Sequence, residues 1–110
     1  MMTRAAKQRM RDLAVKAYER ELRFHLAELV PWFEEWQAKR ISSTELSDRI
    51  HEYHQGPARA VFSNYRQLLS PERKVAWAVA NGTLDESEID AEVLEQLRSS
   101  IDAMRQANDW

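Results

Sequence analysis

Apolar residues recur at helical spacing along the first third of the chain. They follow one another in steps of three and four residues, which keeps them on one helix face: Met10, Ala14, Tyr18, Leu22, Leu26, Leu29, Phe33 and Trp36. The pattern predicts a helix over about residues 3–40. Pro31 lies inside it, where a proline removes a backbone donor and crowds the carbonyl four residues earlier. Because the stripe stays in phase across Pro31, we expect one kinked helix; two helices, with Pro31 at the first position of the second, are the alternative.

Capping residues predict two further helices in the middle of the chain. Ser42 and Glu45 have the spacing of a capping box, and the apolar spacing that follows predicts a short helix ending at His54. The Gln-Gly-Pro segment at 55–57 is expected to end that helix, because glycine suits a left-handed cap and proline can begin the next helix but not continue this one. The expected apolar face of the next helix is Ala58, Val61, Phe62, Tyr65, Leu68 and Leu69. Its aromatic residues are expected in the core.

Two more helices complete the pattern. Ser70, Pro71 and Glu72 supply a cap, a first-turn proline and a first-turn acid, and the helix that they open is expected to end at Asn81 and Gly82. An acidic stretch then leads into the last helix. Its apolar face is formed by Val93, Leu97, Ile101 and Met104.

The predicted fold is therefore all-α. It has about five helices in a single domain over residues 1–110, with a long kinked N-terminal helix (about 3–40) packed on a bundle of shorter helices (about 42–108). Only 2 of the 110 residues are glycine and 3 are proline, too few for the many turns of a β-sandwich or barrel. The chain has no cysteine, which excludes disulfides, thiolate nucleophiles, thiolate zinc sites and iron–sulfur clusters.

The length of the first helix bears on the oligomeric state. A continuous helix over residues 3–40 would be about 55 Å long at 1.5 Å per residue. A compact chain of this size has a diameter of only about 34 Å. Either Pro31 folds the helix back, or its first half frays, or another subunit covers it. Because apolar residues continue into the first half, we expect a homodimer or a larger homo-oligomer built through this helix.

Charge is distributed unevenly along the chain. Residues 1–40 hold nine basic and six acidic residues, whereas residues 70–110 hold four basic and nine acidic ones, within a net charge of −2. Such segments usually pack together, within one chain or between two. We expect the acidic run at 85–95 to pair with the basic N-terminal stretch of a neighbouring chain. The overall acidity argues against a dedicated nucleic-acid binder.

Three aromatic residues gather next to Pro31. Trp32 and Trp36 are four residues apart and can share a helix face, with Phe33 at its edge. They are either a core anchor that docks the kinked segment or an exposed anchor for a partner, and in a dimer both can hold. The expected interface residues are Tyr18, Leu22, Trp32, Phe33 and Trp36.

A polar cluster lies on the predicted helix that ends at His54. His51, Glu52 and His54 are the expected polar site, and Asp48, His51 and His54 are spaced so that neighbours could share part of a metal's coordination sphere. The zinc-protease pattern needs two histidines four residues apart, and here they are three apart. A half-exposed helix with histidines near its C-terminus is the simpler interpretation, and no metal is assigned.

Residues 42–66 also have the outline of a DNA-reading helix-turn-helix, with two short helices around a glycine. Arg59, Asn64 and Arg66 could then contact bases or phosphates. The segment is neutral, however, and its aromatic residues suit a core. An ordinary helical hairpin is the alternative.

No catalytic residue or cofactor is predicted. The sequence has no glycine-rich phosphate loop, no nucleophile elbow and no histidine with an evident serine partner. It has no apolar run of about 18 residues, so no membrane span or signal peptide is expected. Together with the missing cysteines, these features favour a cytoplasmic protein.

The stretch from Glu45 to Arg59 (ELSDRIHEYHQGPAR), the AWAVANG segment at 76–82 and the acidic lead into Val93 resemble a group of small bacterial helical proteins without an assigned activity. The resemblance covers about residues 10–100. It implies that residues 51–57 are a landmark of that family, and it supplies no functional residues.

The sequence thus favours a non-enzymatic cytoplasmic protein that acts through protein–protein association, including self-association. A small nucleic-acid-binding or regulatory module of helix-turn-helix type is the alternative. A metal-binding helical protein is the third possibility.

Overall fold

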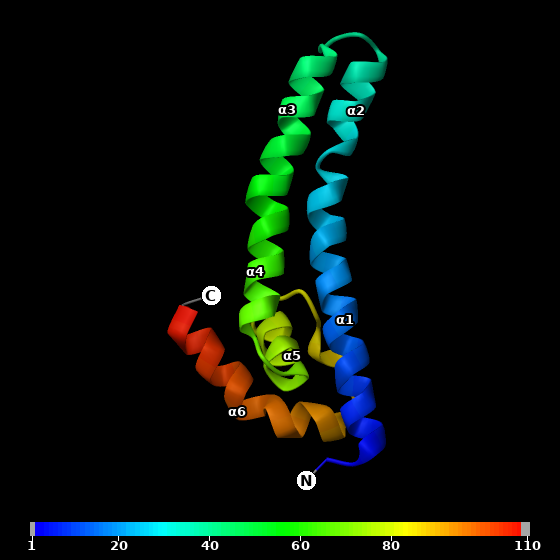
Figure 1. Cartoon of the computed structure of the whole chain (residues 1–110). Helices are drawn as coiled ribbons and strands as arrows, with labels where there is room; N and C mark the ends of the chain where they lie inside the picture. The colour runs from blue at the N-terminus through cyan, green and yellow to red at the C-terminus, as the bar shows by residue number, and fades with distance from the viewer. Residues whose placement is uncertain (1, 109–110) are drawn as a thin grey trace.

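The computed structural model describes residues 2–108, all of whose regular structure is helical (Figure 1). Six α-helices occur in chain order: α1 (Arg4–Ala27), α2 (Val30–Gln37), α3 (Ser43–Tyr53), α4 (Arg59–Gln67), α5 (Pro71–Ala80) and α6 (Ala91–Asn108). A π-helical turn, η1 (His54–Ala58), joins α3 to α4, and a 3-10 turn, η2 (Glu86–Glu88), precedes α6. The predicted all-α class is confirmed.

The chain forms a long helical hairpin with a smaller pair of helices at one end. α1 and α2 run in one direction, and α3, η1 and α4 run back beside them (Figure 1). We call the end that holds α2 and α3 the tip and the end that holds α5 and α6 the base. The molecule measures 57 × 27 × 22 Å. The long first helix is therefore covered along one side by its own chain, a solution that the sequence-based alternatives did not include.

The first helix bends where the sequence predicts a kink. At the junction of α1 and α2, backbone N–H groups bond to the third carbonyl before them instead of the fourth: Glu28 to His25 at 3.2 Å, Leu29 to Leu26 at 3.0 Å and Trp32 to Leu29 at 3.0 Å. Pro31 lies in the first turn of α2, where its missing donor is tolerated. The two segments continue in nearly one direction, so the bent long helix is confirmed, with a local tightening in place of a fold-back.

The first helix ends three residues earlier than predicted. Lys39 adopts φ 61°, and the N–H groups of Lys39 and Arg40 bond back to the carbonyls of Trp36 and Glu35 at 3.0 and 2.9 Å. These two bonds form a Schellman cap. A non-glycine residue at this left-handed position is the reason that the sequence pattern did not predict the helix end.

The prediction that residues 55–57 end a helix is wrong. Gly56 and Pro57 lie inside η1, and the helix continues from Ser43 to Gln67 without a turn. A π-turn has a wider backbone than an α-helix, so it accommodates Pro57, whose ring would otherwise crowd the carbonyl of Tyr53. The predicted second and third helices are one continuous helix.

Three predicted helix boundaries are confirmed by their caps. The hydroxyl of Ser42 accepts the N–H of Glu45 at 3.1 Å, and that of Ser70 accepts the N–H of Arg73 at 3.3 Å. Asn81 caps α5, and Gly82 follows it with φ 85°. Cap residues satisfy backbone groups that a helix end leaves open, which makes them visible in sequence.

The two glycines differ in backbone conformation and supply a matched test. Gly82→Ala is expected to destabilise the fold by about 1–2 kcal/mol, because a side chain strains the left-handed region. Gly56→Ala is expected to change stability by less than about 0.5 kcal/mol, because the helix preference of alanine is opposed by contact between its methyl group and the ring of the following Pro57. Urea unfolding of both variants checks this pair. Equal effects of the two substitutions would contradict it.

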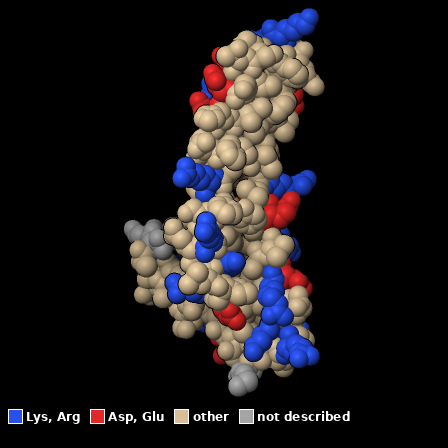
Figure 2. Space-filling view, in the orientation of Figure 1, with Lys and Arg blue, Asp and Glu red and all other residues tan. Residues whose placement is uncertain are grey.

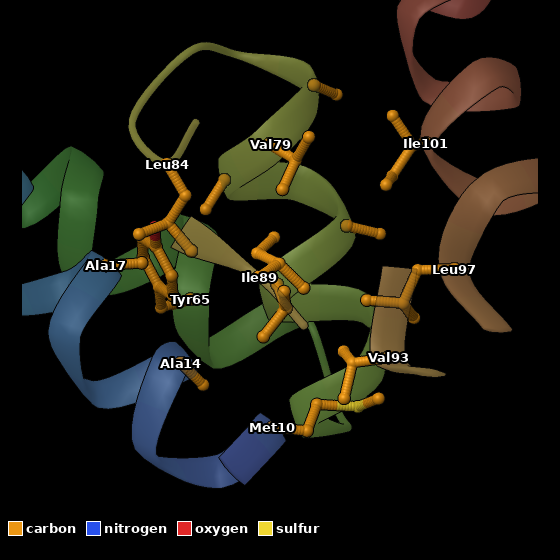
Figure 3. Packing of buried hydrophobic residues seen from close by; sticks show 14 of the residues in the cluster. Met10, Ala14, Ala17, Tyr65, Val79, Leu84, Ile89, Val93, Leu97 and Ile101 are labelled. Carbon is orange, nitrogen blue, oxygen red and sulfur yellow. The ribbon is translucent and has the colours of Figure 1, made fainter. Parts of the chain in front are cut away.

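The hydrophobic core lies at the base. Figure 3 shows Met10, Ala14 and Ala17 of α1 facing side chains of α5 and α6, with Tyr65 of α4 at one side. The apolar face predicted for the last helix is largely confirmed: Val93, Leu97 and Ile101 are buried, and Met104 is partly buried against them. In contrast, α2 has no buried residue and α3 has only Leu46. The base of the hairpin therefore holds most of the buried side chains, and the tip holds few.

Opposite charges at the base pair within the chain. Arg20 of α1 makes a two-pronged contact with Glu88, both N–O distances being 2.8 Å, and Lys16 reaches the same carboxylate at 3.1 Å. Arg9 contacts Asp90 at 2.9 Å. The expectation that the acidic run pairs with the N-terminal stretch of a neighbouring chain is therefore wrong, because its own chain supplies the cations. No helix in the described part of the chain is both long and apolar enough to cross a membrane.

Candidate functional site: an apolar groove on the hairpin

A groove runs along one face of the hairpin between α1 and α4. It consists of two adjoining hollows of about 480 and 550 Å³, which share Tyr18 of α1 and Phe62 of α4. Val15 and Tyr65 line the hollow nearer the base, and Leu22 lines the hollow nearer the tip. We call these two hollows the hairpin groove. Its floor is apolar.

The floor of the groove is held by a pair of tyrosines. The rings of Tyr18 and Tyr65 meet edge to face, with centroids 5.4 Å apart. Tyr65 is buried, and its hydroxyl donates to the carboxylate of Glu21. Burial first, and then the Glu21 carboxylate, raise the pKa of Tyr65 far above its ordinary value, so Tyr65 stays a neutral donor. This arrangement fixes the floor and gives it no acid–base role.

Phe62 projects from this floor and is 52% exposed. The sequence assigns it to the core together with Tyr65, and for Phe62 that prediction is wrong. Val61 and Tyr65 are four residues apart and face α1, and Phe62 lies one position to the side of that line. A large exposed aromatic residue beside a groove is a typical contact residue.

The charged side chains that line the groove are cationic. Arg59 lines the hollow nearer the tip, and Arg66 and Lys74 line the one nearer the base. None of the three has an ion-pair partner among residues 2–108, whereas Arg9, Arg20 and others are paired. The groove therefore combines an apolar floor with unneutralised positive charge on its α4 side.

The α1 side of the groove ends in an acidic edge. Asp12 and Glu19, together with Val15 and Lys16, line a shallow hollow next to it, and the ammonium group of Lys16 lies 3.1 Å from the carboxylate of Glu88. Asp12 and Glu19 are seven residues apart and so lie on one face of α1, one on each side of Val15. Neither carboxylate has an ion-pair partner in the described chain. The nearby Arg11 donates to Gln8 at 2.9 Å. We call Asp12 and Glu19 the acidic edge, and Arg59 and Arg66 the basic edge.

The predicted interface residues lie in two places. Tyr18 and Leu22 line the hairpin groove. At the tip, Trp32 receives the guanidinium of Arg49 at 4.1 Å from its ring centre, and the indole N–H of Trp36 donates to Ser43 at 3.0 Å. Both tryptophans therefore tie α2 to α3. Phe33 remains 40% exposed beside them.

The predicted polar site is only partly brought together. His54 lines the groove next to Tyr18 and Leu22, whereas His51 and Glu52 are exposed and line neither of its hollows. Glu52 lies 3.5 Å from Arg49. Among the described residues, no group of three or more histidine, aspartate or glutamate side chains could hold a metal ion, and this includes Asp48 with His51 and His54.

The predicted nucleic-acid contacts are separated. Arg59 and Arg66 are seven residues apart on one face of α4 and form the basic edge, whereas Asn64 lies on another face. The turn that a helix-turn-helix needs between its helices is replaced by η1. Val15, Lys74 and the acidic edge were not predicted as site residues from the sequence. The spacing of seven between Val15 and Leu22 is the signal that could have revealed the first of these.

Comparison with known proteins gives no family model, no curated protein and no solved structure that matches this chain.

Proposed function

We propose that this protein is non-enzymatic and acts by associating with protein chains, in the first place with a second copy of itself, through the uncovered apolar face of the helical hairpin. One observation carries this proposal. Apolar side chains line one side of the first helix from the base to the tip and stay exposed: Val15 (70%), Leu26 (48%), Val30 (52%) and Phe33 (40%).

These residues form one continuous surface and are not isolated exposed side chains. With Leu22 they follow one another in steps of seven, four, four and three, which keeps them on one side of a helix. The residues at the bend keep helical backbone angles, so the phase continues from α1 into α2. We call Val15, Leu22, Leu26, Val30 and Phe33 the outer stripe.

An outer stripe of this length favours an interface. Single apolar residues on a surface are ordinary, whereas contiguous apolar patches on monomers are limited to a few hundred Å² and are often functional. Figure 2 shows that the half of this face toward the tip is mostly uncharged, with charged side chains at its edges. The absence of cysteine suits a reducing compartment such as the cytoplasm.

The test is the solution mass of the chain and of a stripe variant. We expect light scattering at micromolar concentration to give twice 12.9 kDa for the unmodified chain. Leu26→Glu places a carboxylate in the stripe and is expected to shift the mass toward one chain. Leu69→Glu is the matched control, since Leu69 is 89% exposed and lies outside the stripe. A single-chain mass for the unmodified protein would overturn the proposal.

A further inference from the structure

We infer that the hairpin groove binds a second copy of this chain, turned about a two-fold axis parallel to the hairpin, so that α1 of each copy lies over α4 of the other. This inference rests on the proposed self-association and specifies its geometry. It is carried by the distribution of charge across the groove face.

The unpaired charges that line the hollows differ in sign between the two helices. The acidic edge, Asp12 and Glu19, lies on α1, and the basic edge, Arg59 and Arg66, lies on α4. Apolar side chains, Val15 and Phe62 among them, separate the two. In a two-fold interface each copy offers the same patch, so the patch must be complementary to itself. A patch that carries both acidic and basic residues meets this requirement.

The direction of the axis follows from that division. A two-fold axis parallel to the hairpin places α1 of one copy over α4 of the other. The acidic edge of each copy then faces the basic edge of its partner. An axis across the hairpin would place α1 on α1 and α4 on α4, with carboxylate against carboxylate and guanidinium against guanidinium. Like charges in contact across an interface are strongly unfavourable, so the parallel axis is preferred.

The acidic and basic edges also lie at matching positions along the long axis of the hairpin. Val15 shares a hollow with Arg66, and Leu22 shares the next hollow with Arg59. Rotation about an axis parallel to the hairpin keeps every residue at its own level. Asp12 and Glu19, three residues before and four residues after Val15, then meet the partner copy near Arg66 and Arg59.

The apolar residues fit the same arrangement. Phe62 lies at the level between Val15 and Leu22, because it lines both hollows. On a partner copy turned in this way, Phe62 meets Val15 and Leu22 of α1, of which Val15 is 70% exposed and Leu22 is partly buried in the single chain. Two hairpins packed face to face make a four-helix arrangement, a common way to bury apolar helix faces.

Paired charge reversals test this geometry. Asp12→Lys with Glu19→Lys makes both edges basic, and Arg59→Glu with Arg66→Glu makes both edges acidic. Each double variant alone is expected to form dimers at least about 10-fold more weakly than the unmodified chain, because like charges then face one another. A mixture of the two double variants restores both matches, so it is expected to form heterodimers of normal strength.

The controls separate this geometry from a general effect of altered net charge or of lost folding. Glu95→Lys with Asp102→Lys raises the net charge as much as Asp12→Lys with Glu19→Lys does, at two exposed positions that line neither hollow, and is expected to leave the dimer unchanged. A chain carrying all four edge reversals has its charges exchanged and is expected to dimerise. Helical circular dichroism shows that each variant is folded, and the heterodimer itself shows that both partners are.

Each other outcome overturns the inference. If the unmodified chain is a dimer and the edge reversals leave it intact, the copies meet at a different face, and the proposed self-association stands without this geometry. If each double variant is monomeric but the mixture does not pair, α1 does not lie over α4. A monomeric unmodified chain refutes both the inference and the proposed self-association.

Discussion

Replacing Ile101 with alanine is expected to lower the free energy of unfolding by about 2–5 kcal/mol. Ile101 is fully buried in the base, where α6 packs on α5. Alanine favours a helix at least as well as isoleucine, so the loss comes from the buried methyl and methylene groups and from the cavity that they leave. For a domain of this size the melting temperature should fall by on the order of 10 °C or more.

Denaturant unfolding followed by circular dichroism measures this loss. Leu69→Ala is the control, because Leu69 is 89% exposed, and it should change the free energy of unfolding by less than about 0.5 kcal/mol. If the two substitutions cost the same, the core does not lie at the base as described.

Glu88→Gln is expected to destabilise the chain by about 1–2 kcal/mol at neutral pH. The Glu88 carboxylate joins α1 to the segment before α6: it accepts two bonds from Arg20 at 2.8 Å and one from the backbone N–H of Asp85 at 2.9 Å, and Lys16 lies at 3.1 Å. Arg20 also donates to the carbonyl of Thr83 at 2.9 Å. Glutamine cannot match this two-pronged contact with a guanidinium.

The effect of this substitution should depend on pH. The hydrogen bonds from Arg20, then those from the Asp85 backbone and Lys16, hold the pKa of Glu88 far below its ordinary value. In the unfolded chain the pKa of a glutamate is about 4.3. The ionised carboxylate therefore stabilises the fold above that pH, and its contribution is lost as the pH falls toward the lower folded-state pKa.

A pH series of urea unfolding checks this dependence. The difference in stability between the unmodified chain and Glu88→Gln should be constant near pH 7 and shrink below about pH 4.3. Glu95→Gln serves as control, because Glu95 is exposed and has no ion-pair partner in the described chain. A difference that grows toward acid pH would contradict the assigned network.

Local signals in the sequence predicted the parts of the fold that depend on neighbouring residues. Ser42, Ser70 and Gly82 mark helix ends because their side chains or backbone angles act within a few residues. The apolar spacing of α6 predicts its buried face for the same reason. These features need no knowledge of what packs against the helix.

The features that the sequence did not predict depend on which other segments of the chain each segment packs against. A Gly-Pro pair ends most helices, but here η1 lies between α3 and α4, which both pack along the first helix, and that packing favours a continuous helix. Phe62 is exposed because no third helix of residues 2–108 covers that side of α4. The pairing of Arg20 with Glu88 joins residues 68 positions apart, which charge counts alone cannot assign to one chain or to two.

The candidate site was predicted only in fragments. Tyr18 and Leu22 were expected at an interface, and Arg59 and Arg66 were expected to bind nucleic acid. The structure brings all four to one groove, because α4 runs antiparallel to α1. That juxtaposition depends on the continuous second helix, which the sequence pattern did not predict.

The elongated hairpin also affects how the protein moves through solvent. Its radius of gyration is 17.4 Å, whereas a compact chain of this length has one of about 13 Å. A rod-like particle has more friction than a sphere of equal mass, so a single chain would leave a gel-filtration column early, close to a globular protein of larger mass. Elution volume alone would thus mimic a dimer, and only a shape-independent mass from light scattering or sedimentation equilibrium can count the chains.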